Sequence, residues 1–197
     1  MRYDNDHKQR TRQRVLKAAA KAIRAEGPHR IGVVGVMSDV GLTHGGFYAH
    51  FTSKDDLVAA TIDQMFEESA VRLRRENERR SPIEALDSYI DFYLSPEHRD
   101  TRESGCPLPF LSADAPRLPE PARQRFADGA ARITASLAAC FQSRGDADPD
   151  EEASSLLAEL VGALSLARAE TDPARADAIL ARSRAAVKRR FNLGKVQ

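Results

Sequence analysis

The chain has 197 residues, of which 42% are hydrophobic and 30% are charged, a composition typical of a globular protein with a sizeable core rather than of a disordered one. The polar N-terminus predicts no secretory signal, and no apolar run approaches the roughly 18 residues of a membrane span, so we expect a cytoplasmic protein without membrane partners. In a reducing compartment, Cys106 and Cys140 are expected to be thiols rather than a disulfide.

The net charge of +1 hides an uneven distribution. Residues 1–52 hold nine Lys or Arg and four acidic residues, giving +5, whereas the remainder holds 21 basic and 25 acidic residues, giving −4. Seven basic residues and no acidic one lie between His7 and Ala25. This asymmetry favours a polyanionic partner for the N-terminal segment, although a solvated charged helix face would give the same pattern.

Proline, glycine and capping residues divide the chain into helical segments, and no segment alternates as a strand would. Ser53 to Asp56 and Ser81 to Glu84 have the spacing of capping boxes. A joint with six prolines interrupts the pattern between residues 96 and 121. We therefore expect an all-α fold of about nine helices, with helical segments at 8–26, 33–40, 43–50, 53–78, from 82, from 107, 119–144, 149–170 and 173–191.

Two short helices joined by "GLT" follow a longer one, which is the order of a three-helix helix-turn-helix unit. The second short helix would present its outer face to a DNA major groove. We therefore predict a DNA-binding domain at residues 1–52 and a larger helical bundle at residues 53–197, which would bind an effector and form a dimer. The helix at about 53–78 would link the two.

The segments "RVLKAAAKAIRAEG" and "VGLTHGGFYAHFTSKDDL" resemble the N-terminal domain of TetR/AcrR-family transcriptional regulators. The resemblance implies a repressor that binds a near-palindromic operator in double-stranded DNA. It also implies a homodimer formed through the helices at 149–170 and 173–191, released from DNA by a small molecule or an electrophile. A non-specific DNA-binding protein is the alternative. An enzyme with its site in the bundle is less favoured, because no acid/base pair, nucleophile triad or cofactor motif is found.

Four residues of the second segment match positions that contact DNA in the family. Thr43 would cap the recognition helix and offer its hydroxyl or the first amides to a phosphate. His44 is the first exposed side chain of that helix, where base edges are usually contacted. Tyr48 and Lys54 match the tyrosine and lysine that bind backbone phosphates, contacts that set register without reading sequence.

Gly45 and Gly46 would let the recognition helix lie close against DNA. His50 would either reach a phosphate or cap the turn. His44 and His50 are six residues apart, about 240° around an α-helix, so we predict no metal site. Phe47 and Phe51 are expected in the core.

The effector site is less defined by the sequence. The segment "SGC" ending at Cys106 resembles the electrophile- and oxidant-sensing branch of the family, in which this cysteine is the sensing thiol. Because Pro107 favours the first position of a helix, Cys106 is expected at an N-cap, where the helix dipole would lower its pKa. The alternative is a small residue that packs at a tight turn. The aromatic residues expected to line the pocket are Tyr89, Tyr93, Phe110 and Phe126.

Overall fold

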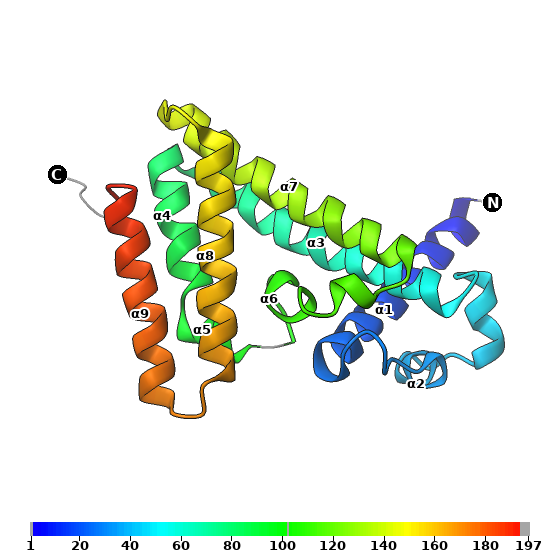
Figure 1. The fold of residues 1–197 in the computed structure, drawn as a ribbon. Coiled ribbons are helices and arrows are strands. Elements are labelled where there is room, and N and C mark those ends of the chain that lie inside the picture. Colours follow the sequence, from blue (N-terminus) through cyan, green and yellow to red (C-terminus); the bar gives the residue numbers. More distant parts are fainter. Residues whose placement is uncertain (1, 102, 194–197) are drawn as a thin grey trace. The chain divides into compact units, whose positions relative to one another are not determined.

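The fold is helical throughout the part of the chain that the structure describes (Figure 1). This computed structural model describes the backbone of residues 2–101 and 103–193, and their side chains except those of residues 2–5, 72, 73, 76, 77 and 79. No strand occurs within these residues, which confirms the all-α prediction. The elements are α1 (Arg2–Glu26), α2 (Val33–Asp39), η1 (His44–Ala49), α3 (Lys54–Arg79), α4 (Pro82–Tyr93), α5 (Pro96–Asp100), α6 (Leu108–Leu111), η2 (Ala115–Arg117), α7 (Glu120–Arg144), α8 (Pro149–Ala169) and α9 (Pro173–Arg190).

The capping signals act as predicted at α4 and in a shifted form at α3. The Ser81 hydroxyl accepts from the Glu84 N–H at 3.4 Å, and the Glu84 carboxylate accepts from the Ser81 N–H at 2.9 Å. These bonds with Ser81 lower the pKa of Glu84. At α3, the Ser53 hydroxyl accepts from the Asp56 N–H at 3.0 Å, but the Asp56 carboxylate accepts from the N–H of Thr52, at 2.8 Å, one residue before the expected donor.

One compact unit consists of Met1–Glu67 and Phe110–Gly129. α1 buries an apolar stripe that includes Val15, Ala19 and Ile23, each 0% exposed, and α2 packs against α1 and η1. Within this unit α7 approaches α3 so closely that a Cβ on Gly129 would lie 2.2 Å from the Phe66 ring. Glycine is therefore required at this position by the packing of the two helices.

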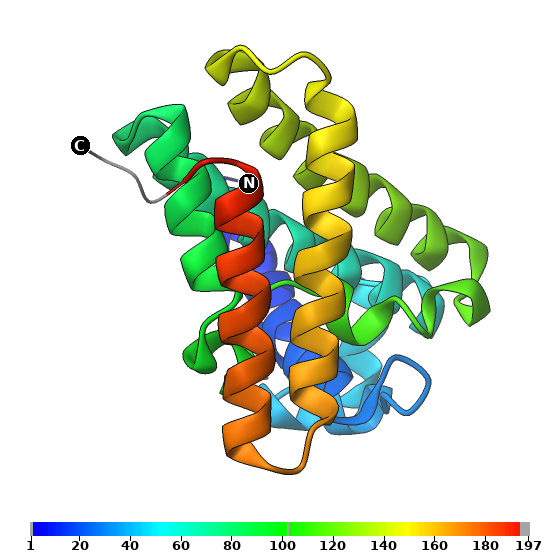
Figure 2. The ribbon, with the colours of Figure 1, turned by 60° about the vertical axis from the view of Figure 1, so that its left-hand side comes forward.

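The second compact unit consists of Glu68–Pro109 and Ala130–Gln197. Its α8 and α9 form a helical hairpin and lie side by side in both ribbon views (Figures 1 and 2). α9 also packs against α4, where Lys188 forms ion pairs with Asp87 at 2.9 Å and Asp91 at 2.7 Å. The functional boundary between residues 52 and 53 stays a prediction. Among the described helices, none is long and apolar enough to cross a membrane.

Candidate DNA-binding interface and effector cavity

The segment predicted as the recognition helix forms a 3-10 helix, η1, rather than an α-helix. Its first hydrogen bond runs from the Gly46 N–H to the Thr43 carbonyl at 3.0 Å, a span of three residues. Two glycines in six residues each disfavour an α-helix by about 1 kcal/mol, and the 3-10 form is common in such short segments. Thr43 occupies the expected N-cap position, but its hydroxyl makes no capping bond. The hydroxyl of this exposed residue is therefore not used by the helix that it precedes.

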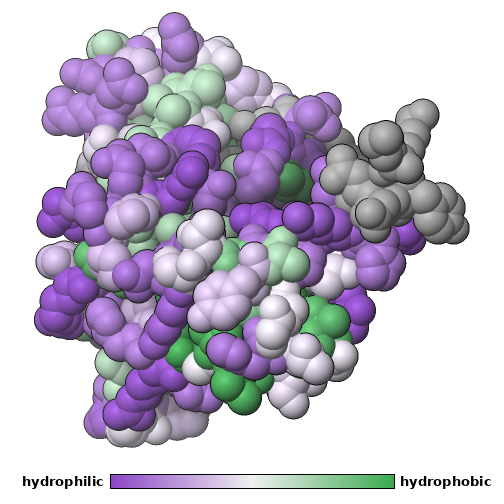
Figure 3. All heavy atoms as spheres, turned by 90° about the vertical axis from the view of Figure 1, so that its right-hand side faces the viewer, coloured by the Kyte–Doolittle hydropathy of each residue, from purple (hydrophilic) through white to green (hydrophobic). Residues whose placement is uncertain are grey.

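A row of aromatic rings separates the buried side of η1 from its exposed side. Phe47 and Phe51 are each 2% exposed and stack with centroids 5.6 Å apart, as expected for core residues. Tyr48 is 66% exposed and contacts the Phe47 ring edge-on at 5.2 Å. The exposed His44 ring packs edge-on against Tyr48 at 5.9 Å. The buried pair thus anchors η1, while His44 and Tyr48 stay on the surface. The face drawn in Figure 3, the right-hand side of Figure 1, is mainly hydrophilic with smaller hydrophobic patches.

The two glycines of η1 are not required by packing within the protein. A Cβ on Gly45 would meet only the Thr43 hydroxyl oxygen, at 3.9 Å, which is an ordinary van der Waals contact. A Cβ on Gly46 would meet a Met37 methyl at 3.8 Å and the same hydroxyl at 4.0 Å. Neither residue adopts a positive φ, so alanine could take both conformations. Their lack of side chains leaves the backbone of η1 open to an external partner.

Lys54 is exposed at the start of α3, as expected, but its ammonium group is partly used within the unit. It donates to the His29 carbonyl at 3.1 Å and so ties α3 to the loop between α1 and α2. This bond uses one of the three donors of an ammonium group. Its binding to phosphate stays a prediction.

His50 is half-buried directly after η1. Burial lowers its pKa, and the positive charges of Lys8 and Arg12, followed by His7, lower it further. Arg12 lies over the Phe51 ring, with 4.9 Å from guanidinium carbon to ring centroid. Sequence reasoning missed Lys8 and Arg12 as individuals, because the only signal was a run of seven basic residues without an indication of which ones meet η1.

The angle between His44 and His50 around the helix axis differs between a 3-10 helix and an α-helix. At three residues per turn, two residues six apart fall on the same side of the axis but roughly 12 Å apart along it. That separation is too long for one ion. Within the described part of the chain, no group of three or more His, Cys, Asp or Glu residues could hold a metal.

In the second unit, three of the predicted effector residues line one cavity. Tyr89 and Tyr93 of α4, with ring centroids 5.6 Å apart, meet Cys106 there. The cavity has a volume of about 180 Å³. Burial raises the pKa of Tyr93, and the adjacent Cys106 thiol raises it further. The full lining is Glu68, Ser69, Tyr89, Phe92, Tyr93, Ser104, Gly105 and Cys106.

The backbone before Cys106 is held by His98, which is 2% exposed and stacks on the Phe92 ring at 4.7 Å. The Nδ1 atom of His98 lies 3.0 Å from the Tyr93 carbonyl, and Nε2 accepts from the Cys106 N–H at 3.4 Å. A carbonyl only accepts, so Nδ1 carries the proton and the ring is neutral in this arrangement. Gly105 has φ +97°, and a Cβ there would lie 2.4 Å from His98 Nε2. The position thus admits only glycine.

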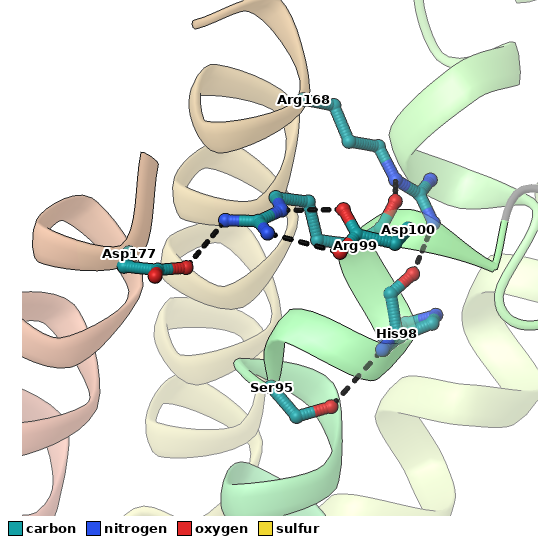
Figure 4. Close-up of polar contacts among 6 residues, drawn as sticks. All are labelled: Ser95, His98, Arg99, Asp100, Arg168 and Asp177. Atoms are coloured by element: carbon teal, nitrogen blue, oxygen red, sulfur yellow. Dashed lines mark hydrogen bonds and ion pairs between the residues drawn. The ribbon is translucent and has the colours of Figure 1, made fainter. Parts of the chain in front are cut away.

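α5, which carries His98, is fastened to the hairpin of α8 and α9 (Figure 4). Arg168 of α8 donates to the His98 carbonyl at 2.7 Å and to the Arg99 carbonyl at 3.2 Å. Arg99 donates to Asp177 of α9 at 2.6 Å and to Asp100 at 2.7 Å. The wall of the cavity is therefore connected to both helices expected at the dimer interface.

Two further predictions for the effector site, the pocket-lining role of Phe110 and Phe126 and the N-cap position of Cys106, do not agree with the structure. Phe110 and Phe126 belong to the first unit, where Phe126 packs edge-on against Phe66 at 5.6 Å, so they are not among the residues that line the cavity described above. Cys106 is not the N-cap residue, because α6 begins at Leu108, one residue after Pro107, and the backbone at Gly105 turns with a positive φ just before Cys106. Since α6 spans four residues, its dipole offers little activation of the thiol. Cys106 and Cys140 are both free and 5% exposed.

The expected dimer surface keeps one large apolar side chain exposed. Leu166 on α8 is 64% exposed, and Gly162, one turn earlier, has nothing within 4 Å of its Cβ position. Leu160 and Leu164 of the same helix are 0% exposed and belong to the core. The surface of α8 that is available for the expected dimer contact is therefore smaller than the number of leucines in this helix would indicate.

Two family models match the chain. The model described as "Bacterial regulatory proteins, tetR family" matches residues 15–61, and "Tetracyclin repressor-like, C-terminal domain" matches residues 82–183. An uncharacterised HTH-type transcriptional regulator of Mycobacterium tuberculosis is 30% identical over 125 residues, which cover 63% of this chain and 62% of that protein. The regulator TtgR of Pseudomonas putida is 29% identical over 44% of this chain and 40% of its own length. The alignments thus span less than two thirds of these relatives.

Solved structures share the fold over nearly the whole chain. The reduced form of NemR from E. coli superposes with a TM-score of 0.78 at 22% identity, covering 91% of this chain and 96% of its own. A TetR-family regulator from Agrobacterium tumefaciens gives a TM-score of 0.78 at 23% identity, covering 92% and 98%. Together with the two family models, these findings lead to one conclusion: the chain belongs to the TetR family of bacterial transcriptional regulators.

Proposed function

We propose that this protein is a homodimeric repressor that binds a near-palindromic operator through η1 and leaves it when an effector occupies the cavity beside Cys106. The main support is the construction of η1, in which buried Phe47 and Phe51 anchor a segment that exposes Thr43, His44 and Tyr48. Recognition helices contact base edges with their first residues, which assigns that role to His44. Tyr48 and Lys54 would bind phosphates on either side and set the register.

The cavity limits the effector to a small molecule. Its volume of about 180 Å³ is close to that of an engineered cavity of about 150 Å³ that binds benzene, so one six-membered ring would fill it. The Tyr89, Phe92 and Tyr93 rings offer flat contacts, and the Cys106 thiol lies in the lining. We propose a single-ring α,β-unsaturated carbonyl compound. The Cys106 sulfur would form a C–S bond with its β-carbon, and the thiol proton would end on the α-carbon, so that no oxidant is needed.

Release from the operator would follow from a population shift. An effector stabilises whichever conformation binds it better, and only that difference in affinity can move the equilibrium. Because Arg168 and Arg99 connect the cavity wall to α8 and α9, an adduct at Cys106 would change the support of the proposed dimer surface. The two recognition segments would then be spaced wrongly for successive major grooves.

Selection of bound sequences from random DNA tests the DNA-binding part of the proposal. A recovered palindrome supports a specific regulator, whereas weak binding that is blind to sequence would support a compacting protein, and absence of binding would contradict the proposal. As a check on the base contact, His44→Ala should change the preference at one position per half-site, by about 1–3 kcal/mol.

The effector part is tested with operator release by N-ethylmaleimide or p-benzoquinone. Cys106→Ser should bind the operator as the wild type does and no longer release it. Cys140→Ser is the matched control, because that thiol is equally buried but lies outside the lining of the cavity, and it should release normally. Release that persists in Cys106→Ser and disappears in Cys140→Ser would refute the assignment.

A further inference from the structure

A cationic cluster forms where α1 passes the end of η1. The cluster consists of Lys8, Arg12 and His50. Two of its members lie around the Phe51 ring: the Arg12 guanidinium carbon is 4.9 Å from the centroid of this ring, and the His50 ring centroid is 6.4 Å from it. Lys8 precedes Arg12 by four residues and so shares its helix face. His7 adds a further positive charge when protonated.

Among the described side chains, no acidic group neutralises the cluster. Lys8 is exposed and Arg12 half-buried, and neither forms an ion pair with an acidic side chain among the described residues. Burial lowers the pKa of His50 most, and the positive charges of Lys8 and Arg12 lower it further. Cations held together in this way at a surface attract an anion, and the arrangement costs free energy until one is bound.

His50 presents a donor to such an anion even when it is neutral. Its Nδ1 atom is buried and has no hydrogen-bond partner in the described part of the chain. A proton on Nδ1 would therefore be buried without an acceptor, which costs about 1–3 kcal/mol. The proton of the neutral ring accordingly belongs on Nε2, at the other end of the half-buried side chain.

The position of the cluster indicates which anion it takes. Ring contacts run without interruption from His44 through Tyr48, Phe47 and Phe51 to Arg12. The cluster is thus rigidly connected to the residues assigned above to the operator. We propose that Lys8, Arg12 and His50 bind a DNA backbone phosphate beside each η1, so that α1 is a further DNA-contacting element. This inference rests on the proposed function.

The test is the salt dependence of binding to the selected operator duplex, measured by fluorescence anisotropy for the wild type and Lys8→Gln. Losing one phosphate contact per half-site should reduce the slope of log K against log salt by about 1.8, since each contact contributes about 0.9. Affinity should fall about 60-fold at 0.1 M salt, and the difference should vanish near 1 M. The selected sequence should stay the same, because phosphate contacts carry no base information.

Lys17→Gln is the matched control, because Lys17 is exposed on the same helix and lies nine residues, or half a turn, away from Lys8. It should keep the wild-type slope. Arg12→Gln should behave as Lys8→Gln does, after its melting temperature has shown that loss of the contact with Phe51 leaves it folded. An anion at the site should also raise the pKa of His50, which NMR titration with the duplex would detect.

The two proposals fail in distinguishable ways. If the wild type shows no sequence preference, the proposed function is wrong. If the wild type selects an operator but Lys8→Gln keeps its slope, the phosphate site on α1 is overturned. An equal loss of slope in Lys17→Gln would also overturn it, because binding would then depend on the total charge of α1 rather than on this cluster.

Discussion

The segment around η1 and the segment around Cys106 use the same residue types in opposite ways. Each contains a histidine among aromatic rings and a glycine nearby. His98 is buried, and both of its ring nitrogens have partners, whereas the buried Nδ1 of His50 has none among the described residues. A Cβ on Gly105 would overlap with His98, but a Cβ on Gly46 would meet only ordinary contacts. The segment around Cys106 thus satisfies its own packing, whereas the segment around η1 leaves contacts to be made.

This difference distinguishes residues that the protein needs for its own packing from residues that are left available to bind a partner. A glycine that no intramolecular contact requires is costly in a helix, so an external surface that must come close is a sufficient reason for it. His50 is similar, because its Nδ1 atom has no hydrogen-bond partner among the described residues and the nearby positive charges of Lys8 and Arg12 lower its pKa in addition to burial. A bound anion would be a sufficient reason for this arrangement as well. The proposed DNA-facing role of η1 accords with these contacts, which the described part of the protein leaves unmade.

The largest effect is expected at Gly105. Gly105→Ala would force a side chain into a positive φ and against the buried His98 ring, at a combined cost of about 3 kcal/mol of unfolding free energy. Urea denaturation measures it. Gly162→Ala, on an open helix face, serves as the control and should not destabilise the protein. An unchanged midpoint for Gly105→Ala would mean that the loop before Cys106 can relax, and the contrast with η1 would be lost.

The next largest effect is expected at Gly46, where alanine should raise the stability of the fold rather than lower it. Gly46→Ala should leave the fold intact and stabilise it by about 0.4–1 kcal/mol, because the unfolded chain loses freedom and the native site has room. Operator affinity should nevertheless fall, by about 1–3 kcal/mol, the amount typical of one lost specific contact. Thermal melting and operator titration of the same sample measure both quantities. Normal affinity in Gly46→Ala would remove the reason proposed for this glycine.

The smallest effect concerns pH. Because the pKa of His50 is lowered in the folded protein, the unfolded state binds more protons as the pH falls below about 6.5. This residue should therefore lower the stability from that pH downward, until the folded form is protonated as well. His50→Asn should flatten the decline in melting temperature between about pH 7 and pH 5. The exposed His44→Asn serves as the comparison, and an equal flattening there would contradict the role given to His50.

Much of the fold could be predicted because its signals are local. The Ser81 cap bonds Glu84 three residues later, and prolines mark the starts of α8 and α9, so these boundaries are written in adjacent residues. The family motif likewise lies within eighteen consecutive residues, 40–57, which identified Thr43, His44 and Tyr48 as candidates. The alternation of buried and exposed rings in η1 follows from the same short pattern.

Other features were decided by residues far apart in the chain. Lys54 bonds the His29 carbonyl 25 residues away, and Arg12 packs on Phe51, so neither partner can be found from spacing. The burial of His98 and the absence of a helix start at Cys106 likewise depend on the packing of α4, α5 and α8. By itself the sequence determined the long helices and the position of the recognition segment, because helical and capping hydrogen bonds span only three or four residues. It also determined the family, because the motif lies within eighteen consecutive residues. Only tertiary structure decided which cations meet η1 and which thiol faces a cavity, because these depend on distances across helices.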